Sequence, residues 1–223
     1  MKLITFQTPE AFNELKEKGI LKVPKKATDL INLKKYGIPY DFIVEQMTQK
    51  IPSQSDEKYP LWAWAKWGHF IAPKKRKNLI HKKQHPYVKI TFCKPKNQVL
   101  LSDYMAYSFI LNGRIVPQNK NEYKKFLKEI ENLGISLDEL KMFVRKDPNK
   151  KVEKIYSKIK KTWPRIFHLK STIHQACVWN IKWEEIEKIE ICDNPEYLYN
   201  SANPIRKDGT RPDWKKEYLK FIP

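Results

Sequence analysis

The chain has 223 residues, enough for one large domain or two small ones, and its 41% hydrophobic and 13% aromatic content argues against disorder. Its three cysteines exclude a disulfide framework and a CxxC zinc site and favour a reducing cytoplasm, and no run of about 18 uncharged apolar residues could span a membrane. The net charge of +19, from 44 Lys and Arg against 25 Asp and Glu, predicts a polyanionic partner, although a lysine-rich proteome would also raise it.

The first element is predicted to be a strand over Lys2–Gln7. Thr8 then has the residue type of a helix N-cap, Pro9 suits the first helical position, and Gly19 suits the end of that helix. A second short helix is predicted over Asp41–Gln49, where apolar residues recur near helical spacing.

The middle of the chain predicts strands at Tyr87–Cys93 and Gln98–Leu101, followed by a helix over Tyr104–Leu111 that either Ser102 or Asp103 caps. Further helices are predicted at 122–133, from 136 onward and from 147 to about 161, and late strands at 174–181 and 186–191.

Strands and helices do not alternate regularly, so the pattern predicts an α+β fold. We expect a single domain over residues 1–223. Its helical block at 119–162 is expected to be an insertion, and its C-terminal segment 194–223, rich in Pro and Tyr, is expected to wrap the surface.

Basic residues are unevenly distributed. No Asp or Glu occurs from Lys58 to Ser102, and a second basic block over Lys141–Lys170 is broken only by Asp147 and Glu153, whereas acids gather at 184–196. This segregation favours a positive face for nucleic acid. The residues expected to bind phosphates are Lys66, Lys74, Lys75, Arg76, Lys77, Lys82 and Lys83.

The chain lacks the sequence motifs of several common binding sites. The chain has only 6 glycines and no Gly-rich phosphate loop, so neither a Walker loop nor a dinucleotide fingerprint is available. His81 and His85 have the spacing of one helical face, but the lysines around them would repel a dication, so we expect no metal site.

Three tryptophans, Trp62, Trp64 and Trp67, fall within six residues. Trp62 and Trp64 alternate, so on a strand they share one face. Indole rings stack on bases or on a nicotinamide ring, but they also pack in cores, and the sequence leaves both interpretations open.

Two further segments could carry chemistry. Ser102 and Asp103 follow a hydrophobic strand at a helix start, where they either bind a ligand or simply cap the helix. Gln175 and Cys177 share one face of a later strand. A buried Gln must hydrogen-bond, whereas Cys177 is either a nucleophile or, as the absence of an assignable partner favours, an inert buried thiol.

These motifs together resemble an uncharacterised bacterial domain-of-unknown-function family, number 3841, whose name implies no activity. The segments that carry the resemblance are Thr5–Thr8, Gly19–Leu21, Tyr59–Trp64, Val99–Asp103, Trp163–Phe167 and Gln175–Trp179.

A more distant resemblance is to ADP-ribosyltransferase-like folds. The opening strand, capped helix and Gly19-Ile-Leu are similar to the first motif of those folds. Gln175-Ala-Cys-Val-Trp, followed ten residues on by Glu185-Ile-Glu-Lys-Ile, is similar to the last motif of members that modify nucleic acid. The resemblance implies a mixed, mostly antiparallel split sheet and a NAD cofactor.

The same resemblance implies roles for individual residues. Gln7 and Thr8 would line the nicotinamide–ribose site, Ser102 would hold the middle motif, and Gln175 would orient the target. Cys177 stands where the resemblance expects a catalytic Glu, so either Asp103 replaces that acid or the protein binds without catalysis.

Two functions follow as hypotheses. The first is a NAD-dependent ADP-ribosyltransferase-like protein that acts on nucleic acid, as a toxin or a phage-defence effector, with Trp62, Trp64 or Tyr104 holding the nicotinamide. The second is a non-catalytic DNA- or RNA-binding module with a basic, Trp-rich groove. A regulatory protein partner is compatible with either.

Overall fold

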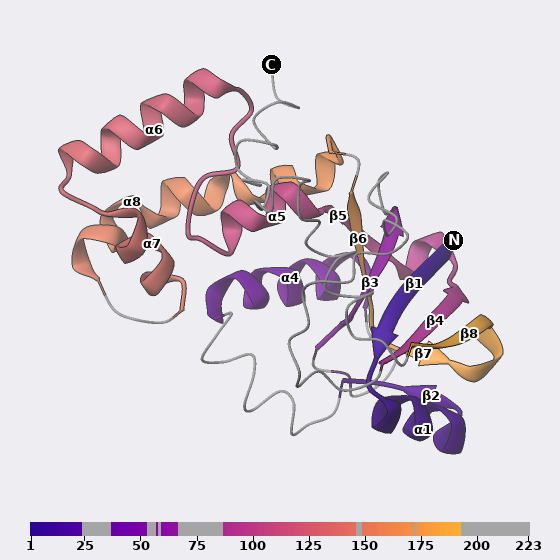
Figure 1. Ribbon diagram of the computed structural model, residues 1–223. Helices are drawn as coiled ribbons and strands as arrows, with labels where there is room; N and C mark the ends of the chain where they lie inside the picture. The colour runs from indigo at the N-terminus through magenta and orange to yellow at the C-terminus, as the bar shows by residue number, and fades with distance from the viewer. Residues whose placement is uncertain are drawn as a thin grey trace, which may run out of the picture.

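The computed structural model describes residues 1–23, 37–52, 57, 59–66, 87–145, 149–171 and 173–192 (Figure 1). The strands are β1 (Lys2–Gln7), β2 (Ile20–Leu21), β3 (Leu61–Lys66), β4 (Tyr87–Cys93), β5 (Leu100–Asp103), β6 (His174–Val178), β7 (Ile181–Lys182) and β8 (Ile186–Cys192). The helices are α1 (Pro9–Lys18), α4 (Gly37–Lys50), α5 (Tyr104–Ile110), α6 (Lys120–Asn132), α7 (Leu137–Phe143) and α8 (Lys150–Lys161), with short 3-10 turns η2 (Lys96–Gln98), η3 (Trp163–His168) and η4 (Trp183–Glu185).

Six strands form one open sheet in the order β5-β6-β3-β1-β4-β8, and β2 pairs with β7 in a separate ribbon. Every pairing among the described strands is antiparallel. The expected α+β class with a mostly antiparallel sheet is therefore confirmed. Because β3 lies between β1 and β6, the segments that the sequence singled out at the start, middle and end of the chain are neighbours in the sheet.

One face of the sheet packs on α1. Leu3, Ile90 and Phe92 are fully buried there with Leu15 of α1. Side chains alternate along a strand, so Leu3 on this face implies that Ile4 and Phe6 point to the other one, where both are half-buried. The strand phase thus decides which residues of β1 can reach the helical side.

The other face packs on the helical block of α4 to α8 and η3, which Figure 1 shows gathered on one side of β5 and β6. Trp163 is completely buried at the centre of this block, and its indole Nε1 donates to the carbonyl oxygen of Arg114 at 3.1 Å. Leu100 and Cys177 carry the sheet's side of the same core. Within the described residues, helices α4 to α8 therefore cover the β5–β6–β3 end of this face.

Most predicted elements are present with shifted ends. The helix expected at Asp41–Gln49 begins earlier, at Gly37, and the strand expected at Gln98–Leu101 lies at Leu100–Asp103. Helices α6 to α8 fall within the expected block at 119–162. The expected tail at 194–223 lies outside the described residues.

Gly113 lies where no side chain fits. Its φ of 65° is left-handed, and a Cβ there would lie 2.2 Å from the carbonyl oxygen of Leu140. Gly113→Ala should cost about 1–2 kcal/mol for the conformation, plus the cost of the clash. Gly19→Ala is the matched control, since Gly19 has a φ of 70° with nothing near its Cβ, and it should cost only the first part. Urea unfolding measures both, and equal losses would contradict the packing described here.

Candidate functional site

A row of three predicted residues crosses the helical face of the sheet. Trp64 on β3 lies opposite Gln175 on β6, and Gln175 lies opposite Ser102 on β5. Directly opposed side chains on one face have Cβ atoms about 4.5–5.5 Å apart, so Gln175 is in reach of both Trp64 and Ser102. This row lies two residues along the strands from the core row of Trp62, Cys177 and Leu100, at the border of the helical layer.

Two polar atoms in this row have no hydrogen-bond partner. Ser102 is 1% exposed, and both its Oγ and the Oε1 of Gln175 are buried and unpaired in the structure. An unpaired buried oxygen costs about 1–3 kcal/mol, and most buried polar groups are satisfied. Two such atoms on facing residues are unusual, and hydrogen bonds from a partner would recover the cost of leaving them unpaired.

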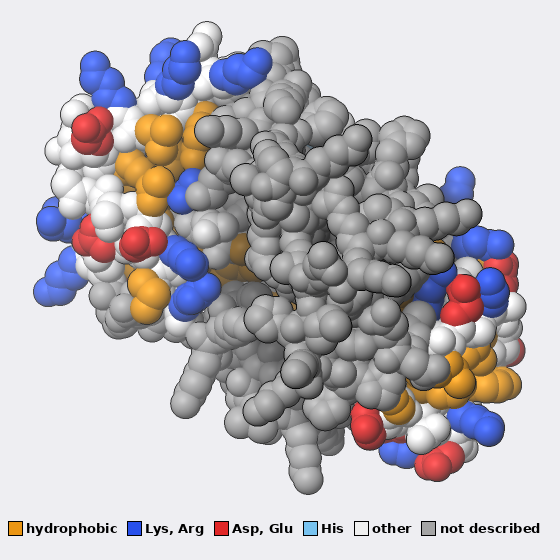
Figure 2. Space-filling view, in the orientation of Figure 1, with side chains coloured by type: hydrophobic (Ala, Val, Ile, Leu, Met, Phe, Trp, Pro, Cys, Tyr) orange, Lys and Arg blue, Asp and Glu red, His pale blue; other side chains and the backbone are white. Residues whose placement is uncertain are grey.

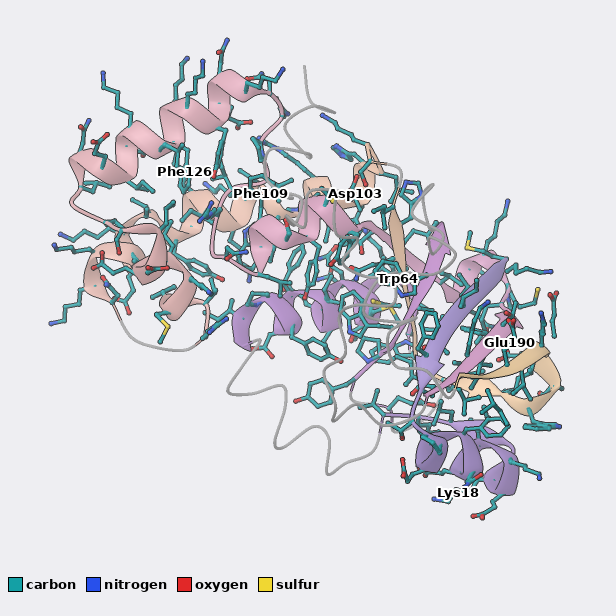
Figure 3. The ribbon with its side chains drawn as sticks, in the orientation of Figure 1. Lys18, Trp64, Asp103, Phe109, Phe126 and Glu190 are labelled. Carbon is teal, nitrogen blue, oxygen red and sulfur yellow. The ribbon has the colours of Figure 1, made fainter. Side chains whose placement is uncertain are left out.

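Aromatic rings bound the polar pair. The ring of Trp64 meets the ring of Tyr104 at 5.2 Å between centroids and 65° between planes, an edge-to-face contact. Tyr104 starts α5 one residue beyond Asp103, and burial raises the pKa of its hydroxyl, which stays protonated at neutral pH. Figure 3 shows Trp64 near the middle of the sheet. We call Trp64, Ser102, Tyr104 and Gln175 the candidate site.

Trp62 does not join the site. Its ring packs on Tyr107 at 5.2 Å and on Tyr40 at 6.2 Å between centroids, against the helix-side core. Trp62 is half-buried against this core, whereas Trp64, which is also half-buried, lies beside the polar pair. Trp67 lies outside the described residues.

Cys177 is buried at 1% exposure, and burial raises the pKa of its thiol well above the usual value. A protonated buried thiol is a poor nucleophile. The inert interpretation of Cys177 is thus the one the structure supports, and the position that the resemblance reserves for a glutamate carries no charge.

Asp103 has a structural role that leaves it unsuited to catalysis. Its Oδ1 accepts from the backbone N–H of Ala106 at 3.0 Å, which caps α5, and from the hydroxyl of Ser171 at 2.8 Å. Its Oδ2 accepts from the backbone N–H of Ser171, and the residue is 1% exposed. Capping therefore replaces the expected catalytic role, because three donors already use the carboxylate.

Gln7 and Thr8 also lie apart from the candidate site. The amide of Gln7 donates to the hydroxyl of Thr5 at 2.8 Å, and Thr5 is buried on the α1 face of the sheet. Thr8 is exposed and caps α1 by accepting from the backbone of Ala11. Neither residue therefore lies beside Gln175, because strand phase turns Gln7 to the α1 face and Thr8 lies beyond β1 at the start of α1.

Most of the basic residues expected to bind phosphates lie outside the described residues. Lys66 ends β3, but its side chain lies outside the described residues. The other members also lie outside them: Lys74, Lys75, Arg76, Lys77, Lys82 and Lys83.

A buried ionic network that sequence reasoning missed lies at the opposite end of β6. Lys94, only 4% exposed, pairs with Glu185 at 2.6 Å and donates to Oδ1 of Asn180 at 3.1 Å, and Asn180 donates to Glu57 at 2.9 Å. Lys94, Asn180 and Trp179 border a pocket of about 90 Å³. These residues are far apart in sequence, so no spacing predicts the network. Each carboxylate in it has a cation beside it, because Lys22 pairs with Glu57 at 3.2 Å.

Among the described residues, no cluster of three or more His, Cys, Asp or Glu side chains could bind a metal ion. No helix in that part of the chain combines the length and apolarity needed to cross a membrane.

Residues 2–187 match the model of the family described as Domain of unknown function (DUF3841), and the chain belongs to this family. No curated protein and no solved structure matches the chain. Family membership confirms the first resemblance seen in the sequence and adds no activity to it.

Proposed function

We propose that this protein is a NAD-binding, ADP-ribosyltransferase-like protein that acts on nucleic acid. The observation that carries the proposal is the unpaired Ser102 and Gln175 beside the ring of Trp64 on one face of the sheet. The order β6-β3-β1 supports it, since the strands of the first and last motifs of the resemblance both flank the Trp strand.

The unpaired polar groups of the candidate site complement the hydrogen-bonding groups at the nicotinamide end of NAD. A nicotinamide is a flat ring that bears a carboxamide, whose N–H groups can donate to Oε1 of Gln175 and whose oxygen can accept from the hydroxyl of Ser102. Both protein atoms lack other partners, so such bonds would recover their desolvation cost. Trp64 and Tyr104 would hold the ring and exclude water.

The residues of this chain have limited roles in the proposed reaction. Gln175 and Ser102 hold and orient the carboxamide, and Trp64 fixes the plane of the ring. When bound, NAD would supply the ADP-ribosyl group as its bond to nicotinamide breaks, and a nucleophilic atom of the nucleic acid would take that group and lose a proton. Cys177 and Asp103 supply no carboxylate for this step.

The missing carboxylate favours a second candidate function, a nucleic-acid-binding module that retains the fold without catalysis. The charge of +19 supports this function equally. We place either protein in the cytoplasm, in keeping with the unpaired thiols of Cys93 and Cys177. Toxin and phage-defence roles are compatible with the proposal.

Incubation with labelled NAD and an RNA or DNA oligonucleotide tests the proposal. The transferase function predicts release of free nicotinamide and transfer of label to the oligonucleotide. Binding of the oligonucleotide without release would overturn it in favour of the second function.

Ser102→Ala gives a graded version of this test. Loss of one hydrogen bond to the ligand should weaken NAD binding about tenfold, equivalent to about 1.4 kcal/mol, in isothermal titration calorimetry. Ser108→Ala is the control, because the Ser108 hydroxyl donates to the carbonyl oxygen of Met105 within α5 and should leave NAD affinity unchanged. Equal affinity in the Ser102 variant and the wild type would remove Ser102 from the site.

A further inference from the structure

The outward surface of α6 carries four lysines, Lys120, Lys124, Lys125 and Lys128. All four are exposed, and within the part of the chain that the structure describes none has an ion pair or side-chain hydrogen bond. Lys120, Lys124 and Lys128 are spaced by four residues, so they follow one ridge of the helix at about 6 Å intervals. Figure 2 shows Lys and Arg side chains along this outer margin of the molecule.

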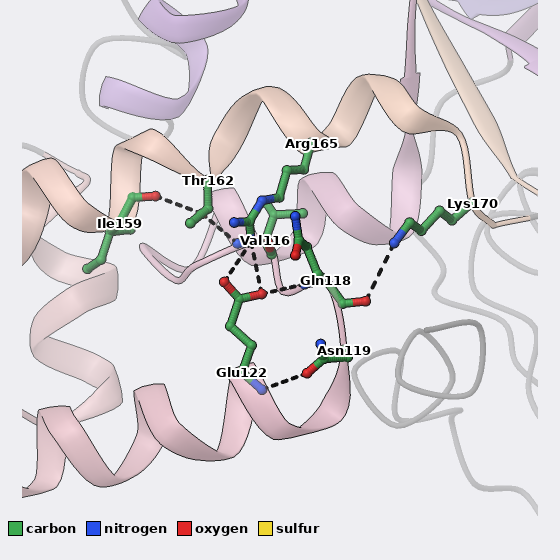
Figure 4. A network of polar contacts seen from close by, with 8 residues as sticks. All are labelled: Val116, Gln118, Asn119, Glu122, Ile159, Thr162, Arg165 and Lys170. Carbon is green, nitrogen blue, oxygen red and sulfur yellow. Dashed lines mark hydrogen bonds and ion pairs between the residues drawn. The ribbon is translucent and has the colours of Figure 1, made fainter. Parts of the chain in front are cut away.

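Two glutamates of α6, Glu122 and Glu129, pair with residues of neighbouring elements. Glu122 pairs with Arg165 at 2.9 Å and accepts from the backbone N–H of Gln118, which ties the start of α6 to η3 (Figure 4). Glu129 pairs with Lys158 of α8. The acids thus hold α6 to its neighbours, and apart from Glu131 at its end the outer surface is left positive.

We propose that the lysine ridge of α6, made of Lys120, Lys124 and Lys128 with Lys125 beside it, binds the phosphate backbone of a nucleic acid. This inference deepens the proposed function, because it names the surface for the nucleic-acid target, and it rests on that part of the proposed function alone. A straight line of cations at even spacing complements a regular polyanion, and phosphate contacts supply most of the sequence-independent affinity.

The apolar side of α6 argues against a membrane surface as the partner. Tyr123, Phe126 and Ile130 are buried in the core, and Figure 3 shows Phe126 beneath α6 while nitrogen-tipped side chains project from its outer side. Helices that lie on membranes place their apolar side in the lipid, which α6 cannot do. The ridge instead offers Asn121 and Asn132, whose amides can donate to phosphate oxygens.

The fold connects the ridge to the candidate site through α5. Tyr104 of the site begins α5, and Phe109 near the end of this helix packs edge-on against Tyr123 of α6, 5.5 Å between ring centroids. A seven-residue helix spans about 10 Å, and packed helices lie about 8–10 Å apart. The site and α6 therefore belong to one packed unit, with the lysines on the side of α6 that faces away from α5.

The test compares two triple variants of the full chain that lose the same charge. The ridge variant is Lys120→Gln, Lys124→Gln and Lys128→Gln, and the control on α8 is Lys150→Gln, Lys154→Gln and Lys161→Gln, whose lysines are also exposed and unpaired. Glutamine keeps the helix propensity, and circular dichroism checks folding. Affinity for a labelled 20-base-pair DNA duplex and for a single-stranded RNA is measured against salt by fluorescence anisotropy.

The ridge variant should bind the duplex more than about tenfold more weakly, and its log–log salt slope should be shallower by about 2.7, or 0.9 for each lost phosphate contact. The control should keep the wild-type slope.

An unchanged slope in the ridge variant, or equal losses in both variants, would overturn the proposal. Ridge-dependent binding to phosphatidylserine vesicles without binding to either nucleic acid would overturn it as well. Nicotinamide affinity, measured without nucleic acid, should be the same in both variants and the wild type. A result against the ridge can therefore be told apart from a result against the proposed NAD site.

Discussion

Replacing Asp103 by alanine should lower the free energy of unfolding by about 3 kcal/mol and the Tm by about 10 °C. The loss has two sources. The cap of α5 at Ala106 contributes about 1 kcal/mol, and the buried N–H and hydroxyl of Ser171 lose their acceptor. Differential scanning calorimetry and urea unfolding measure the change.

Asp138→Ala is the matched control for this variant. Asp138 lies exposed in the first turn of α7, so its loss removes the same charge and costs about 0.3–1 kcal/mol through the helix dipole. If Asp103→Ala unfolds like the wild type and loses transferase activity, a catalytic Asp103 would be restored and the structural role would be wrong.

Gln175→Leu should abolish nicotinamide binding without loss of stability. The wild type should gain about 2.7 kcal/mol of stability at a nicotinamide concentration 100 times its Kd, and the variant should gain none. Without ligand, the variant should be as stable as the wild type or more so, because leucine removes a buried oxygen that has no partner. Thermal unfolding with and without nicotinamide measures both effects.

Gln98→Leu serves as its control, since Gln98 borders the separate pocket beside Lys94. That variant should respond to nicotinamide like the wild type. Loss of the response in Gln98→Leu with retention in Gln175→Leu would move the ligand to the other pocket and contradict the site described here.

Local signals predicted the ends of α1 correctly because short-range chemistry controls them. Thr8 caps the helix and Gly19 ends it with a left-handed φ of 70°. The start of α4 was missed because a tertiary contact defines it. The N–H of Ile38 donates to the carbonyl oxygen of Val144, more than a hundred residues away, at 3.0 Å.

The candidate site could be predicted only in part for a similar reason. Alternation showed that Gln175 and Cys177 share a face, but it could not show that Ser102 and Trp64 lie on either side of Gln175, because register depends on pairing between distant strands. The same uncertainty misplaced Gln7, whose strand phase is decided by packing on α1. The spacing of the lysines on α6 can be read from the sequence. The pairing of Glu122 with Arg165 and of Glu129 with Lys158, which leaves the lysines on the outer side, depends on the tertiary fold.

The most direct measurement is a crystal structure of the protein with nicotinamide. We expect the carboxamide within hydrogen-bond distance of Oε1 of Gln175 and Oγ of Ser102, with the ring against Trp64. Nicotinamide bound elsewhere, or Ser102 and Gln175 bonded to each other across β5 and β6, would contradict this expectation.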